Sequence, residues 1–279
     1  MTSLFDSTFF ECSVDGGIAH LEMANAEKAN AMSPDFWGDL PRIVQALGAD
    51  PNVRVIVLSG QGKHFTGGMD LAAFQGIMAL TQREPGRAAF ALRDLIMRLQ
   101  SALSALEDVR VPVIAAIHGV CLGGGIDLIT AADIRIATAN AQFGIEEIHV
   151  GMAADVGTLQ RLPKLIPLGI VRELTYTGRR FSAQEAKEWG LVNSVHDGRE
   201  AMLDAAFDLA RQIAAKSPLA IAGAKQSLTY ARDHSVAEGL EQIATWNAGM
   251  LRPDDLMKAA QAKMSRQDAE FDNLLDETG

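Results

Sequence analysis

Three carboxylic acids occur in apolar segments beside glycine-rich turns, and they are the residues best suited to chemistry. Asp127 ends the run Gly-Gly-Gly-Ile-Asp, Glu147 lies in Phe-Gly-Ile-Glu-Glu-Ile, and Asp155 lies in Gly-Met-Ala-Ala-Asp-Val-Gly. A carboxylate in apolar surroundings costs free energy unless it has a partner or a function. Acids that lie close together cannot all ionise freely, so their pKa values separate. Such a group can hold a proton acceptor and a proton donor at neutral pH.

Each acid also has a purely structural explanation. Asp127 falls in the first turn of an expected helix, where the helix dipole favours a negative charge. Glu147 follows Glu146, as in a solvated surface turn, and Asp155 stands where a helix N-cap is expected. For any one of these residues alone the structural explanation is the better one. Their combined occurrence near two glycine-rich turns favours a catalytic group.

Two glycine-rich loops, residues 59–71 and 119–125, each follow an expected strand and precede an expected helix, the first of which would begin at Met69. Backbone N–H groups at helix N-termini lack intrahelical partners and can point at an oxygen that gains negative charge. One N–H from each loop would form an oxyanion hole, in which a donor contributes roughly 2.7–4 kcal/mol. Neither loop has P-loop or dinucleotide-binding spacing, and an ordinary connection is the alternative for each.

The first two hundred residues alternate strand and helix patterns. Apolar, β-branched runs at 53–58, 113–117 and 134–137 predict buried strands, and residues 18–23 alternate like a half-buried strand. Ser33 followed by proline predicts the start of a helix, with the serine as its cap. This order predicts an α/β core built from βαβ units.

The pattern beyond about residue 163 is mostly helical. Helical spacing of apolar residues is clearest at 201–216, 218–232 and 236–251. We therefore expect an α/β core over residues 1–200 and a helical region over residues 201–279.

Composition excludes several classes of protein. A net charge of −10 over 279 residues disfavours nucleic acid as a partner, because phosphate binding needs a basic face. The longest apolar stretch, residues 109–126, is interrupted by Arg110, Pro112 and four glycines, so we expect no membrane span. The six histidines show no metal-ligand spacing, and we assign no metal site.

The cysteines and the chain ends predict a cytoplasmic protein. Cys12 and Cys121 are far apart in the sequence and form no disulfide framework. The first residues lack a signal peptide, and the last three are not a peroxisomal tripeptide.

Several segments, taken in order, resemble the crotonase superfamily, which has the enoyl-CoA hydratase/isomerase fold. They are residues 25–32, the run Lys-His-Phe-Thr-Gly-Gly-Met-Asp-Leu, Ile-His-Gly before the triple glycine, Asp-Ile-Arg, Ala-Gln-Phe-Gly, and Gly-Thr-Leu-Gln-Arg-Leu-Pro. The resemblance covers nearly the whole chain and implies a spiral core of ββα units with a helical C-terminal oligomerisation region.

Within the superfamily, the chain is most similar to the Δ3,5-Δ2,4-dienoyl-CoA isomerases. The similarity lies in Gly-Gly-Gly-Ile-Asp and in Glu-Ile-His-Val-Gly-Met-Ala-Ala-Asp-Val-Gly-Thr. Hydratases of the superfamily usually have glutamate where Asp127 stands and glycine where Asp155 stands. The resemblance therefore favours an isomerase that acts in fatty-acid β-oxidation.

The resemblance also implies the substrate and its contacts. The substrate is an acyl-CoA thioester, whose carbonyl oxygen lies between the backbone N–H groups of Met69 and Gly124. No metal or redox cofactor is implied, since coenzyme A is part of the substrate, and the family forms trimers that pair into hexamers. The implied substrate-binding residues are Lys28, Ala29, Ala31, Gly67, Gly68, Asp70, Leu71 and Gly125.

In the implied reaction, Glu147 removes a proton from C2 of a 3,5-dienoyl thioester and Asp155 returns one at C6, while Asp127 holds the polar network. One alternative is an enoyl-CoA hydratase that adds water to a 2-enoyl thioester, although Asp127 is one methylene shorter than the usual glutamate. Another is a non-catalytic binding member of the same fold, which the acidic net charge and the complete set of acids disfavour.

Overall fold

A six-stranded sheet forms the centre of the molecule. The computed structural model describes residues 4–70, 75–76, 78–80, 82 and 84–275. In the strand order β1-β2-β3-β4-β6-β9, the first pair is antiparallel and each later pair is parallel. The strands are β1 Phe10–Asp15, β2 Ile18–Met23, β3 Val55–Gly60, β4 Val113–Ile117, β6 Ile134–Thr138 and β9 Ser194–His196. Strands β3 and β4 are buried along their whole length, as is usual when helices cover both faces of a parallel sheet.

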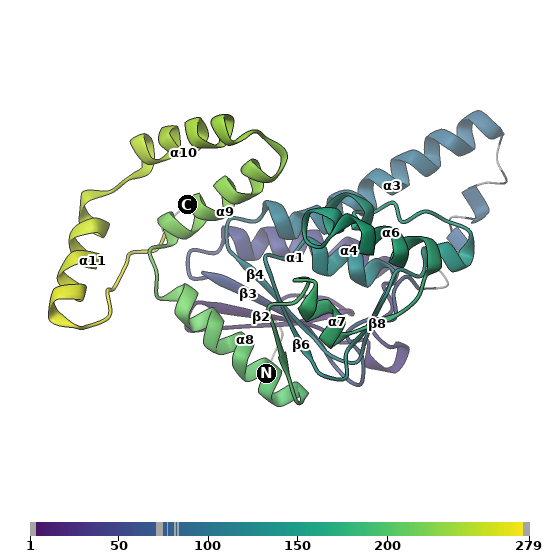
Figure 1. Cartoon of the computed structure of the whole chain (residues 1–279), viewed down its shortest axis with the longest axis horizontal. Coiled ribbons are helices and arrows are strands. Elements are labelled where there is room, and N and C mark those ends of the chain that lie inside the picture. The colour runs from purple at the N-terminus through teal and green to yellow at the C-terminus, as the bar shows by residue number, and fades with distance from the viewer. Residues whose placement is uncertain (1–3, 71–74, 77, 81, 83, 276–279) are drawn as a thin grey trace.

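Helices cover both faces of this sheet (Figure 1). Helix α1 (Pro34–Ala49) and the C-terminal half of α3 (Pro85–Asp108) pack on one face and form the larger core. The hydroxyl of Ser33 accepts the N–H of Phe36 at 3.4 Å, so the predicted cap of α1 is confirmed. Helix α8 (Arg199–Ala214) packs on the other face, where small residues such as Ala206 let it approach the strands closely.

A three-stranded sheet, in the order β5-β7-β8, holds the second glycine-rich turn. Its strands are β5 Val120–Leu122, β7 Gln142–Gly144 and β8 Phe181–Ser182. The rings of Phe143 and Phe181 stack between β7 and β8, with centroids 5.3 Å apart. The short elements around this sheet are α4 Gly124–Thr130, η2 Glu147–Val150, α5 Thr158–Arg161, η3 Leu162–Lys164, α6 Leu168–Thr177 and α7 Ala183–Glu188. The three acids come from α4, from η2 and from the segment that leads into α5.

The C-terminal helices extend away from the sheet (Figure 1). They are α9 Pro218–Asp233, α10 Val236–Met250 and α11 Pro253–Ser265, and the last two contain no buried residue. Helix α8 lies within the predicted helical region yet packs on the sheet, and the proposed division at residue 200 stays a prediction. In the described part of the chain, no helix is both long and apolar enough to cross a bilayer.

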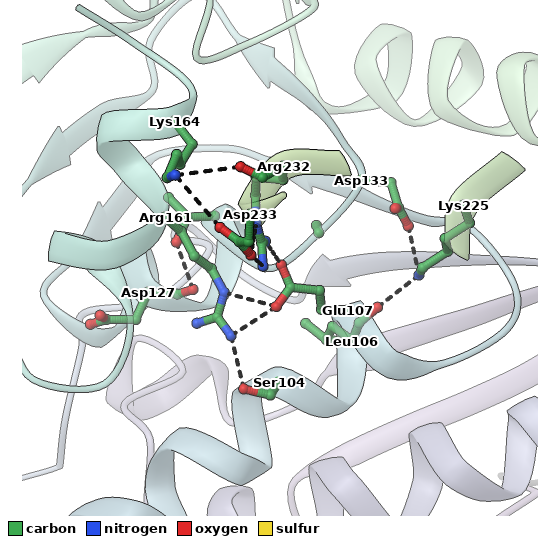
Figure 2. A network of polar contacts seen from close by, with 12 residues as sticks. Ser104, Leu106, Glu107, Asp127, Asp133, Arg161, Lys164, Lys225, Arg232 and Asp233 are labelled. Atoms are coloured by element: carbon green, nitrogen blue, oxygen red, sulfur yellow. Dashed lines mark hydrogen bonds and ion pairs between the residues drawn. The ribbon is translucent and has the colours of Figure 1, made fainter. Parts of the chain in front are cut away.

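Lys225 fastens α9 to the core. Its buried ammonium group donates to the carbonyl oxygens of Leu106 and Val111 at 2.9 and 3.0 Å and to Asp133 Oδ2 at 2.9 Å (Figure 2). Burial lowers the pKa of Lys225, whereas the Asp133 carboxylate opposes that change. Three acceptors from three separate segments therefore depend on one side chain of α9.

Replacing this ammonium group tests that role. Lys225→Met keeps the aliphatic stem but removes the donor shared by Leu106 and Val111 and leaves the Asp133 carboxylate with the N–H of Val113 and no cation, so we expect a loss of about 3 kcal/mol of unfolding free energy. For a chain of this size that loss corresponds to a fall of roughly 6–12 °C in Tm, measurable by differential scanning fluorimetry. The matched control is Lys216→Met, because Lys216 is exposed. Equal Tm values for the two variants would contradict the anchoring role.

Candidate active site

Asp127 lies fully buried in the first turn of α4. Its Oδ1 accepts the backbone N–H of Thr158 at 2.5 Å, whereas its buried Oδ2 has no hydrogen-bond partner among the described residues. Helix α4 follows Gly123, whose φ of 50° belongs to the left-handed region that favours glycine. Asp127 thus ties α4 to α5 through one oxygen and keeps the other unpaired.

Glu147 approaches the same turn from η2. It is partly buried, and its Oε2 is also buried without a partner in the described part of the chain. A Cβ added to Gly123 would lie 3.4 Å from Glu147 Oε1. The carboxyl group of Glu147 therefore lies against the turn that begins α4.

Asp155 lies in the segment between η2 and α5 and is partly exposed. The amide of Gln100 donates to its backbone carbonyl oxygen at 2.6 Å, which joins this segment to α3. The charge of Asp155 raises the pKa of both Asp127 and Glu147. The structure therefore brings together the three acids that the sequence singled out.

The three acids have raised proton affinities. Burial raises the pKa of Asp127 to about 6, an effect that its bond to Thr158 opposes. Burial, followed by the neighbouring charge of Asp127, raises the pKa of Glu147 to about 7. Burial also raises the pKa of Asp155. Proton exchange near neutral pH is therefore within the range of this group, as acid–base chemistry requires.

The two glycine-rich loops lie side by side. Thr66 and Cys121 form an isolated parallel bridge, and the N–H of Leu122 donates to the Thr66 carbonyl oxygen at 3.2 Å. Gly68 has a φ of 93°, and a Cβ there would lie 2.9 Å from the Leu122 carbonyl oxygen. Only glycine permits both this backbone conformation and this close approach.

Each loop presents a free backbone donor. The N–H of Gly124 occupies the first position of α4, where no side chain caps the helix. The N–H groups of Met69 and Gly124 have no hydrogen-bond partner among the described residues. The prediction that a helix begins at Met69 is wrong, since Met69 forms an isolated parallel bridge with Met32. Main-chain pairing with Met32 overrides the helix expected at this position.

The early loop, residues 25–32, is bound to the first glycine-rich loop. Asn30 is fully buried in the left-handed region, and its side-chain amide donates to the carbonyl oxygens of Gln61 and His64 at 3.0 and 2.8 Å. The N–H of Gly67 donates to the Ala29 carbonyl oxygen at 2.8 Å. The sequence analysis gave Asn30 no separate role, although asparagine is one of the few residues that readily adopt this conformation.

The predicted substrate-binding residues occupy different positions around these loops. Lys28 and Gly67 are exposed, and Ala29, Ala31 and Asp70 are partly buried. Gly68 is buried at the contact between the loops, and Gly125 is buried where a Cβ would lie 2.6 Å from the Thr66 side chain. Leu71 lies outside the described residues.

Arg161 is a charged neighbour of the site that the sequence analysis missed. Its Nη2 donates to Ser104 Oγ at 2.8 Å and to Glu107 Oε2 at 3.2 Å (Figure 2). A Cβ on Gly157 would meet both Arg161 Nη1 and Asp127 Oδ1 within 4 Å, so the guanidinium group lies beside that acid. Its charge lowers the pKa of Asp127. No sequence spacing marks Arg161, because its partners come from a distant helix.

No cluster suited to a metal occurs within the described ranges, when groups of three or more His, Cys, Asp or Glu side chains are considered. The expected absence of a metal or redox cofactor stays a prediction.

A family model described as enoyl-CoA hydratase/isomerase matches residues 13–273. The chain belongs to this family. A mitochondrial Δ(3,5)-Δ(2,4)-dienoyl-CoA isomerase of Rattus norvegicus is 47% identical over 254 residues, which are 90% of this chain and 78% of that protein. A peroxisomal Δ(3,5)-Δ(2,4)-dienoyl-CoA isomerase of Arabidopsis thaliana is 42% identical over 262 residues, which are 93% of this chain and 94% of that protein.

Solved structures of the family confirm the expected crotonase-like α/β fold. An enoyl-CoA hydratase from Bacillus anthracis has a TM-score of 0.86 at 30% identity, and the match covers 95% of this chain and 99% of that chain. The helical C-terminal region is included in this match, because so little of either chain lies outside it.

The expected cytoplasmic location is wrong. The dienoyl-CoA isomerases of this family that resemble the chain carry names that place them in mitochondria or in peroxisomes. The expectation rested on the terminal motifs and on the absence of a disulfide framework. Such motifs lie outside the catalytic fold, and that fold is shared by relatives from both organelles.

The raised pKa of Asp127 predicts a pH-dependent stability. Its folded-state pKa of about 6 exceeds the ordinary 3.8, so its stabilising contribution is present below pH 3.8 and is lost as the pH rises through 6. The unfolding free energy of Asp127→Asn minus that of the wild type should therefore increase by roughly 3 kcal/mol as the pH rises from 4 to 7. Urea unfolding across this range measures the difference.

The control for this experiment is Asp197→Asn, since Asp197 is exposed and lies outside the acid group. Its stability relative to the wild type should stay level over the same pH range. If the stability difference between Asp127→Asn and the wild type also stayed constant with pH, the raised pKa of Asp127 would be contradicted.

Proposed function

We propose that the chain is a Δ3,5-Δ2,4-dienoyl-CoA isomerase, which shifts the double bonds of a 3,5-dienoyl thioester to the 2,4 positions in fatty-acid β-oxidation. The observation that carries this proposal is Asp155, a third acid whose charge reaches both Asp127 and Glu147. Relatives that bear this name and are 42–47% identical to the chain support it.

The two free backbone donors would stabilise the charge that forms. Loss of a proton from C2 of the thioester spreads negative charge over the dienolate and onto the carbonyl oxygen. The N–H groups of Met69 and Gly124, fixed on adjoining loops, would meet that oxygen as its charge increases. Donors that are already oriented stabilise the transition state more than the ground state, which is the requirement for catalysis.

The acids would supply and accept the protons. Glu147, with a pKa of about 7, accepts the proton from C2, and Asp155 delivers a proton to C6. The substrate and the product have the same composition, but one turnover leaves Glu147 protonated and Asp155 ionised. The proton must then return between them before the next cycle. Burial raises the pKa of both acids.

The remaining polar residues would hold this arrangement. Asp127 keeps α4 and α5 together through its bond to the Thr158 N–H and raises the pKa of Glu147 by its charge. Coenzyme A would contact the early loop at Lys28, Ala29 and Ala31. No metal or redox cofactor takes part in these proton transfers.

A hydratase activity on 2-enoyl thioesters is the second candidate. Asp127 Oδ2 and Glu147 Oε2 are both buried and unpaired within the described structure, and two such acceptors could hold a water molecule for addition across C2 and C3. Asp155 would then have no role. The same fold occurs in the enoyl-CoA hydratase from Bacillus anthracis.

The exposed apolar side chains of the C-terminal helices support assembly into trimers or hexamers. Leu240, Leu256 and Met257 are all more than half exposed. Burial of such side chains against another subunit is favourable at about 25 cal/mol per Å² of apolar surface. Size-exclusion chromatography with light scattering would distinguish a monomer, a trimer and a hexamer.

Removal of the third acid tests the isomerase. Asp155→Asn should lower kcat for a 3,5-dienoyl-CoA by about 10²–10⁴-fold, because the amide cannot deliver the proton at C6. Binding of the acyl-CoA should persist, since the substitution keeps the size of the side chain and leaves the residues of both donor loops unchanged. The rise in ultraviolet absorbance of the 2,4-dienoyl product measures turnover. Asp197→Asn is the matched control and should keep full activity.

Full isomerase activity in Asp155→Asn would overturn the role given to Asp155. Hydration of a 2-enoyl-CoA, measured in parallel, separates the two candidate activities. A wild-type protein that hydrates the 2-enoyl thioester but leaves the 3,5-diene unchanged would replace the isomerase with the hydratase. If neither thioester turned over, the result would favour a non-catalytic binding protein.

A further inference from the structure

We infer that Met32 is the positioning residue of the oxyanion hole, because it contacts both loops that carry the two backbone donors. Its main chain fixes the peptide of Met69, and its thioether packs against Gly124. This inference rests on the proposed function, in which these two N–H groups bind the thioester carbonyl oxygen.

The main chain of Met32 sets the direction of the first donor. The N–H of Met32 donates to the Gly68 carbonyl oxygen at 2.8 Å, and the N–H of Asp70 donates to the Met32 carbonyl oxygen at 3.2 Å. In a parallel bridge of this kind, the two bonds go to the residues on either side of the paired residue. The N–H and C=O of Met69 therefore point away from Met32. The two bonds hold Met69 with its N–H on the side away from Met32.

The side chain of Met32 sets the position of the second donor. Met32 is fully buried, and its Sδ lies 3.0 Å from the point that a Cβ on Gly124 would occupy. The thioether therefore packs against Gly124, the first residue of α4. Interiors are close-packed, so the removal of such a contact leaves the turn free to shift.

One residue thus couples two donors that lie far apart in the sequence. Thr66 adds support on the same side, since its hydroxyl donates to the Asn30 carbonyl oxygen at 2.7 Å and accepts the N–H of Gly68 at 3.1 Å. A displacement of about 1 Å in a positioned group can reduce the rate by about 10²-fold. The side chain of Met32 is therefore expected to affect the chemical step although it donates no bond to the substrate.

The test measures the hydrogen bonding of the thioester carbonyl by infrared spectroscopy. Octanoyl-CoA with a ¹³C-labelled thioester carbonyl cannot isomerise, and its infrared stretching frequency falls when hydrogen-bond donors polarise the bond. The wild type should lower this frequency relative to free octanoyl-CoA. Met32→Ala should return it toward the free value and reduce kcat for 3,5-octadienoyl-CoA by about 10²-fold, with a much smaller change in KM.

The matched control is Met23→Ala, because Met23 is equally buried in the same core, but its main chain pairs with Gly60 rather than with Met69 and its side chain is not within 4 Å of the point that a Cβ on Gly124 would occupy. It should lower Tm to a similar extent and leave the carbonyl frequency at the wild-type value. Met32→Leu and Met23→Leu conserve volume and should fold even if the alanine variants do not. Met32→Leu should show a frequency between the wild-type and free values.

Wild-type frequencies in both Met32 variants would overturn the inference while the isomerase proposal stands. An equal loss of polarisation in the Met23 and Met32 variants would overturn it too, since the effect would then be one of general stability. A wild-type protein that binds octanoyl-CoA without any frequency change would refute the oxyanion hole itself and Met32's role with it. Turnover of the 3,5-diene, assayed separately, decides the isomerase proposal.

Discussion

The hydrogen bond between the Thr158 N–H and the buried Asp127 carboxylate is the constraint on which the rest of the site depends. It joins the first turn of α4 to the start of α5, and the segment between η2 and α5 carries Asp155. An ionisable group without exposure is tolerated only because this bond and the nearby Arg161 charge offset part of its desolvation. The bond therefore positions Asp127 against the start of α5 and lowers the proton affinity of that acid.

The close approach of the two glycine-rich loops is the second constraint. Gly68 packs against the Leu122 carbonyl oxygen, and Gly123 leaves room for the Glu147 carboxyl group. A side chain at Gly68 would push the two loops apart, and Gly123 has a φ of 50° that favours glycine. Backbone donors held in this way need little reorganisation when charge develops, which is the physical basis of oxyanion stabilisation. The glycines thus connect the local backbone conformation to the proposed chemistry.

The sequence predicted the long, strongly patterned elements and missed the short ones. The apolar runs became β3, β4 and β6, and the helical spacing after residue 200 became α8, α9 and α10. Strand β9 has three residues and none of them is fully buried, so no periodicity marks it. Helix α11 was not assigned from the sequence, and like α10 it contains no buried residue. Met69 was expected at the start of a helix, but its conformation follows from main-chain pairing with Met32, which is distant in the sequence.

The sequence by itself determined the chemistry of the site, because the identities of Asp127, Glu147 and Asp155 and the glycine-rich turns are local properties. Only the tertiary structure decided which oxygens are paired, how burial raises each pKa and which groups support the donors. Those properties depend on contacts between segments far apart in the chain, such as Thr158 with Asp127. Desolvation and packing arise from all neighbours at once, and no spacing along the sequence encodes them.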